Sequence, residues 1–278
     1  MTVRAFSSEV DTGSREESAS KQESGAPFRF HRNGNSSRSR LLWVTVGICL
    51  ILRPSLAAQL HVEPVLLELG APVAAGVLTL RNDDDVEAVV QTRVVRWSQS
   101  NGNDVFEPAT DVVASPPSVT LAPRADYVVR IVRVSKQPVA AEESYRVIVD
   151  QLPSVVRQQN RSVNVLIRQS IPVFFRARDI RPASVSWTLR REANRLVLTA
   201  SNAGSEHLRI ASLRLRNSAG AAISYGNGLA GYVLGQSVKS WILPSHPAGF
   251  DVRGSLSVMA ESNKGPVSAA AQSSDGPR

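Results

Sequence analysis

The chain has 278 residues, of which 42% are hydrophobic, 20% charged and 5% aromatic, a composition typical of globular proteins. Residues 58–278 hold 24 basic and 19 acidic residues, and because the arginines are spread along the chain without a basic helix, nucleic-acid binding is not expected. The single cysteine, Cys49, lies before this part of the chain, which therefore contains no disulfide, Cys-ligated zinc or Cys nucleophile.

Residues 1–57 are predicted to be a leader that includes a signal peptide. Arg38 and Arg40 precede an apolar run over residues 41–52, which is shorter than the roughly 20 residues needed to cross a bilayer. Small residues at 55–57 supply a cleavage site, so the protein is expected to be exported. Because Arg53 separates the apolar run from that site, a translation start placed too far upstream or a short signal anchor remain alternatives.

The segment from residue 58 to residue 177 is predicted to be a β-sandwich. Short runs rich in Val, Ile, Leu and Thr alternate between apolar and polar residues, which is typical of half-buried strands. Turn residues separate them, as at 82–85 and 100–104. The expected strands are 60–69, 75–82, 88–97, 125–134, 143–152 and 162–175. Their number and spacing favour an antiparallel sandwich.

A second β domain is predicted over residues 178–260, after a charged, proline-containing hinge near residues 176–182. Its expected strands are 184–190, 194–202, 207–216, 232–243 and 250–259. Residues 261–278 consist mainly of Ser, Ala and Gly without clear periodicity and are predicted to be a disordered tail. The fold class is therefore all-β, with two immunoglobulin-like sandwiches.

Catalytic motifs are missing from residues 58–278. The sequence there contains no GxSxG, HExxH or P-loop pattern. Its three histidines, His61, His207 and His246, do not pair at helical spacing, so they are expected to be surface residues or buried residues with satisfied hydrogen bonds. No enzyme activity, metal, other cofactor or small-molecule substrate is expected.

The long strand-like run at 161–176 is the most informative segment. Val163, Val165 and Ile167 fall on one face of an extended strand, and Leu166 falls on the other. Such a run is either an interior strand covered on both faces or an edge strand whose side chains are offered to a partner that lacks a strand.

Spaced motifs over residues 59–260 resemble the periplasmic pilus-assembly chaperones of the chaperone/usher pathway, and look most like their archaic branch. The most specific piece, residues 111–131, holds a Pro-Pro pair (Pro116 and Pro117), an apolar pair, a further proline and then Arg130. Trp97, the segment YRVIVDQLP, the Asn-x-Gly-x-x-His pattern at 202–207 and the Leu-Gly-x-Ser pattern at 234–237 add to the match.

The resemblance implies a periplasmic chaperone of a Gram-negative cell, with pilin subunits and an outer-membrane usher as partners. Val163, Val165 and Ile167 would then complete a pilin that lacks its last strand. The resemblance also places Arg130 in an interdomain salt bridge, for which Glu142 or Glu143 could supply the carboxylate; an exposed Arg130 remains the alternative.

One family feature is absent. The family anchors the pilin's C-terminal carboxylate with two basic residues, whereas the corresponding positions here hold Leu66 and Pro172. Arg168, on the same strand face as Pro172, is a candidate substitute. The alternative function is a secreted immunoglobulin-like structural or adhesive module without a client.

Overall fold

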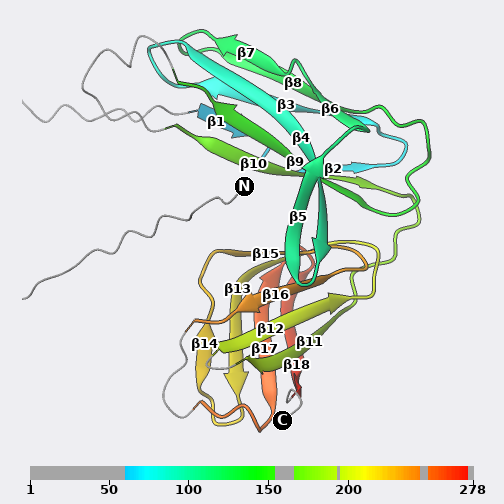
Figure 1. Cartoon of the computed structure of the whole chain (residues 1–278), viewed down its shortest axis with the longest axis vertical. Helices are drawn as coiled ribbons and strands as arrows, with labels where there is room; N and C mark the ends of the chain where they lie inside the picture. The colour runs from blue at the N-terminus through cyan, green and yellow to red at the C-terminus, as the bar shows by residue number, and fades with distance from the viewer. Residues whose placement is uncertain (1–59, 154–165, 193–194, 245–249, 275–278) are drawn as a thin grey trace, which may run out of the picture. The chain divides into compact units, whose positions relative to one another are not determined.

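The computed structural model describes residues 60–153, 166–192, 195–244 and 250–274. These residues form strands and loops, and among them no helix is long and apolar enough to span a membrane (Figure 1). The predicted signal peptide, Val163 and Val165 lie outside the described residues. The all-β class with two β domains is confirmed.

The first domain consists of two sheets. One sheet has the strand order β1-β3-β8-β6, and the other has the order β2-β10-β9-β4-β5, with β7 paired to β4. The strands of the first sheet are β1 (Leu60–Glu63), β3 (Ala75–Asn82), β8 (Asp126–Arg133) and β6 (Val112–Ser115). Those of the second sheet are β2 (Leu67–Gly70), β10 (Arg168–Arg176), β9 (Glu143–Gln151), β4 (Ala88–Ser100), β5 (Asn103–Pro108) and β7 (Ser118–Leu121). We call the second sheet the β10 sheet.

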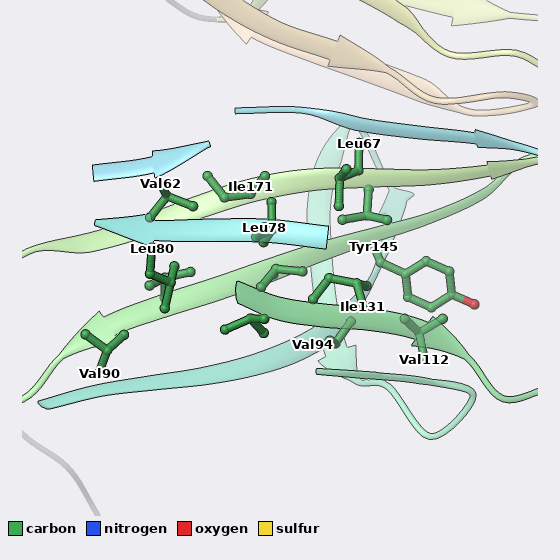
Figure 2. Packing of buried hydrophobic residues seen from close by; sticks show 14 of the residues in the cluster. Val62, Leu67, Leu78, Leu80, Val90, Val94, Val112, Ile131, Tyr145 and Ile171 are labelled. Carbon is green, nitrogen blue, oxygen red and sulfur yellow. The ribbon is translucent and has the colours of Figure 1, made fainter. Parts of the chain in front are cut away.

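The core of the first domain is filled by side chains that alternate along these strands. On β8, Val129 and Ile131 are fully buried, whereas Val128 and Arg130 are exposed. Figure 2 shows Leu78 and Leu80 among the other buried apolar side chains of this core. On β8, period-two alternation thus buries one row of side chains and leaves the other row exposed.

The second domain is an eight-stranded sheet with its own core. The strand order is β14-β13-β17-β18-β11-β12-β16, with β15 paired to β13. The strands are β11 (Val185–Glu192), β12 (Arg195–Asn202), β13 (Leu208–Asn217), β14 (Ala222–Ser224), β15 (Leu229–Val233), β16 (Val238–Ile242), β17 (Leu256–Ser262) and β18 (Gly265–Ser274). Trp187, Leu198, Leu213 and Val258 are among the buried side chains.

The prediction of a disordered tail from residue 261 is wrong. Residues 265–274 form β18, which pairs antiparallel with β17 and parallel with β11. Val267, Ala269 and Ala271 turn toward the core and alternate with exposed residues. Because the inward residues are mostly alanine, the period-two pattern was too weak to be seen in the sequence.

Candidate functional site

Aromatic side chains connect the two domains. Trp97 on β4 lies 5.9 Å from Phe174 on β10 and 5.4 Å from Tyr232 on β15, measured between ring centroids. All three are buried, together with Leu234. Leu66 packs against this cluster. The first of the two positions at which a basic anchor was expected therefore contributes to an apolar contact.

Arg146 on β9 lies over this aromatic cluster. Its guanidinium carbon is 3.9 Å from the ring centroid of Trp97, a cation–π geometry, and 5.4 Å from that of Tyr232. Its Nη1 donates to the carbonyl of Ser170 at 3.3 Å, while its Nε is buried without a hydrogen-bond partner. Burial lowers the pKa of Arg146, but an arginine remains charged at physiological pH.

The charge of Arg146 is not balanced by an ion pair within the described part of the chain. The acid with an electrostatic effect on it, Asp104, already accepts hydrogen bonds from Lys239 at 2.6 Å and from the indole of Trp97 at 3.0 Å. In the antiparallel pairing of β9 with β10, Arg146 lies opposite the buried Pro172. A cation is thus present beside the expected anchor position, on the neighbouring strand.

A group of acidic and basic side chains around the buried His207 forms a second connection between the domains. Glu142, with 1% of its side chain exposed, lies 2.9 Å from Nδ1 of His207. The His207 ring is fully buried and stacks on Phe174 at 3.7 Å between centroids. Arg176 on β10 contacts Glu206 at 3.1 Å, and Lys264 contacts the same carboxylate at 2.7 Å. Charged groups from both domains therefore meet around His207.

Local structure in the second domain explains how Glu206 and His207 are positioned. Asn202 is buried and donates to the carbonyls of Glu206 (2.8 Å) and Leu234 (3.1 Å), while its side-chain oxygen accepts from the N–H of Gly204. A Cβ at Gly204 would lie 2.0 Å from the carbonyl oxygen of Pro182, so only glycine fits there. The Asn-x-Gly-x-x-His pattern seen in the sequence is this turn.

The three residues predicted for the interdomain salt bridge have different surroundings. Arg130 is exposed on the outer face of β8 and has no ion pair among the described residues, so the structure does not bring it to Glu142 or Glu143. Glu143 is instead bound by Arg133, through contacts of 2.7 and 2.8 Å. Of the three, Glu142 is the residue that joins the other domain, through His207.

The reason for this difference is the period of β8. Val129 and Ile131 are buried, so the next inward residue is Arg133, with 6% of its side chain exposed. Arg130 lies on the opposite, exposed face of the strand. Arg176, Glu206 and Arg146 were not singled out in the sequence, because their partners are set by tertiary contacts. Arg176 meets Glu206 of the second domain, and Arg146 lies over Trp97 and Tyr232.

Arg168, the candidate anchor, begins β10. Its Nε contacts one carboxylate oxygen of Asp150, and Arg93 contacts the other at 2.7 Å. The side chain of Arg168 is 67% exposed. Unlike Arg146, Arg168 already has an acidic partner.

The start of β10 has a free edge among the described residues. Antiparallel pairing with β9 runs from Arg168 to Phe175, and the carbonyl of Ile167 accepts from the N–H of Gln151 at 3.0 Å. On its other side β10 pairs with β2, but only from Val173 onward. Along Arg168–Pro172 no described strand occupies that side, and these residues follow directly after Ile167.

Comparison with known proteins agrees with this architecture. Residues 59–181 match the family of pili and flagellar-assembly chaperones, through the PapD N-terminal domain. The resemblance to pilus-assembly chaperones predicted from the sequence is thereby confirmed. A search of curated protein sequences finds no match.

Solved structures extend the likeness to both β domains. A chain of the CsuC–CsuE chaperone–tip adhesion subunit complex, from the archaic Csu pili of Acinetobacter baumannii, is 22% identical, with a TM-score of 0.61 over 78% of this chain and 100% of that chain. The E. coli chaperone DraB is 19% identical, with a TM-score of 0.52 over 77% and 98%. A chain of the SafA pilin–SafB chaperone complex of Salmonella enterica is 16% identical, with a TM-score of 0.53 over 77% and 96%. The protein therefore has the two-domain fold of these chaperones.

Proposed function

We propose that the protein is a periplasmic pilus-assembly chaperone, without enzymatic activity, that captures a pilin subunit by lending it a strand. The observation that carries this proposal is the free edge of β10 along Arg168–Pro172, in direct continuation of the alternating apolar run that ends at Ile167. A free strand edge has unpaired backbone donors and acceptors, which an incoming strand can satisfy. The chaperone–pilin and chaperone–adhesin complexes among structures of the same fold support this reading.

In this proposal Val163, Val165 and Ile167 enter the groove that the missing strand leaves in the pilin. Burying three such side chains contributes about 5–8 kcal/mol before the cost of ordering the segment. No ATP is required, because the energy comes from burial and backbone pairing. The complex would then pass to an outer-membrane usher.

Arg146 is proposed to bind the C-terminal carboxylate of the pilin. It is a partly buried cation without an ion pair among the described residues, and it lies opposite Pro172, where the family's anchor is missing. A carboxylate bound in such a partly desolvated site gains more from a guanidinium than it would in water. Arg168 is less suited to this role because Asp150 already neutralises much of its charge.

The test is co-expression with a pilin subunit, followed by co-purification. Val165→Asp combined with Ile167→Asp should abolish capture while the chaperone stays folded, because two charges would enter the apolar groove of the client. Asn164→Asp adds a charge to the same segment on the other face and is the matched control, expected to retain capture.

Two outcomes would overturn the proposal. If a folded double variant still captures the pilin, these side chains are not the donated ones. If the unaltered protein captures no pilin at all, the alternative of a structural or adhesive module gains support.

A further inference from the structure

Beyond the aromatic cluster, the β10 sheet has a second group of charged residues near the start of β10. Asp150 on β9 lies between Arg93 on β4 and Arg168 on β10, and each guanidinium contacts a different oxygen of its carboxylate. Only 10% of the Asp150 side chain is exposed, compared with 47% for Arg93 and 67% for Arg168. Two cations thus share one buried acid, and the group carries one excess positive charge.

Strand register puts these three residues on the same face of the sheet. Asp150 lies opposite Gln91 on one side and Arg168 on the other, and Arg93 is two residues from Gln91 along β4. Together with Leu152 and Leu166 they line an open hollow of about 450 Å³. Leu166, 48% exposed, connects this hollow directly to the segment proposed to enter the client.

Few of the N–H donors of the two arginines are bound by other protein atoms in the described part of the chain. A guanidinium has five N–H donors, and in the described part of the chain the side chains of Arg93 and Arg168 bond only to Asp150. Planar guanidinium groups bind carboxylates through paired hydrogen bonds. Excess positive charge, N–H donors without a protein partner among the described residues, and an open hollow together fit an acidic side chain from outside.

We propose that Arg93 and Arg168 receive an acidic side chain of the client, an Asp or Glu adjacent to the strand that the client pairs with β10. This inference rests on the proposed chaperone function. It adds that the two arginines select clients that carry an acidic residue at this position. Asp150 holds the two guanidinium groups in place before the client arrives and competes with the client's carboxylate for them. An acidic client is therefore favoured over one that is neutral or basic at this point.

Because Asp150 competes with the client's carboxylate, removing its charge should strengthen capture of the client rather than weaken it. Asp150→Asn keeps the size of the side chain but removes its charge, so it should strengthen capture of a co-expressed pilin by about threefold to tenfold. Arg168→Glu should weaken capture by about tenfold or more and make it less sensitive to salt between 50 and 500 mM. Arg130→Glu, at an exposed site on the other sheet, makes the same charge change and should have little effect.

Thermal unfolding of each variant separates binding from stability. A group that serves only to stabilise the sheet would lose stability in Asp150→Asn and gain nothing in capture. If the folded Asp150→Asn variant captures the pilin no better, or if Arg168→Glu behaves like Arg130→Glu, this inference fails while the chaperone function stands. If the unaltered protein captures no pilin, both fail.

Discussion

The carboxylate of Glu142 bonds to His207 at two points, 65 residues further along the chain. It accepts from the backbone N–H of His207 at 2.9 Å, and its two oxygens lie 2.9 and 3.0 Å from the ring Nδ1. Both side chains are almost completely buried. Glu142 precedes β9 in the first domain and His207 precedes β13 in the second, so this pair joins the two domains.

Glu142→Ala should destabilise the protein by about 3 kcal/mol or more. The substitution leaves the N–H and the buried ring nitrogen of His207 without their acceptor, and an unsatisfied buried polar group is costly. Thermal or urea unfolding measures the loss. An unchanged transition would show that water satisfies His207 equally well.

Arg133 and Arg130 should respond differently to substitution, although they are three residues apart on β8. Arg133→Ala removes a buried guanidinium that forms two bonds with Glu143 and two with backbone carbonyls, and it should cost about 3–5 kcal/mol. Arg130→Ala should change stability by less than about 0.5 kcal/mol, because its side chain is exposed. Equal losses of unfolding free energy for the two variants, measured by urea unfolding, would contradict the observed orientation of these side chains on β8.

Gly102, at the turn between β4 and β5, contacts the edge of β16 and should not tolerate a side chain. Its φ is +78°, and a Cβ would lie 2.4 Å from Oγ of Ser240. Gly102→Ala should therefore combine backbone strain with the loss of the hydrogen bond from Ser240 N–H to Gly102 C=O.

Gly220 provides the control for this substitution. Its φ of +85° is similar, but the nearest atom to an added Cβ is 3.8 Å away, at the end of the Arg216 side chain. Gly220→Ala should show the cost of backbone strain alone, about 1 kcal/mol. Gly102→Ala should cost clearly more in thermal unfolding; equal costs would mean that the turn can move away from Ser240.

Arg146→Met should weaken pilin capture with little loss of stability. Methionine keeps an apolar contact with Trp97, and no ion pair within the described residues is broken. We expect a change in unfolding free energy within about 1 kcal/mol but a clear loss in co-purification of pilin. Trp97→Ala is a useful contrast, because it should reduce stability by about 3 kcal/mol or more.

Ala271→Asp tests whether β18 is part of the folded second domain. Ala271 is 8% exposed and pairs with Trp187 on β11 and Leu256 on β17. A carboxylate there would be buried without a partner, so the second domain should unfold at a markedly lower temperature. Ala270→Asp, on the exposed face of the same strand, should be tolerated.

Much of the fold could be predicted because apolar alternation directly reflects which strand face is buried. Strands 75–82 and 143–152 carry large apolar residues at alternate positions along their middle, Leu78 and Leu80 in the first and Tyr145, Val147 and Val149 in the second. Both strands are confirmed within one residue at each end. β18 was missed because alanine carries a weak signal. The inward position of Arg133 follows from the alternation along β8, but Arg130, a charge within the apolar run, was predicted to form the ion pair instead.

The charged groups around the candidate site were harder to predict. Arg146 lies beside Pro172 only through the register of β9 against β10, and Glu142 reaches His207 only through contact between the two domains. Sequence patterns give the face on which a side chain lies. Sequence patterns do not show which residue of the neighbouring strand lies directly opposite, and this site is defined by such pairings.

The position of β2 also limits how far a client strand can pair along the edge of β10. β2 occupies the edge of β10 from Val173 onward, and the residue just before it, Pro172, has no N–H to donate. A client strand added along this edge therefore ends at Pro172. In the proposed chaperone, β2 would therefore set the limit to which a captured subunit can pair along β10.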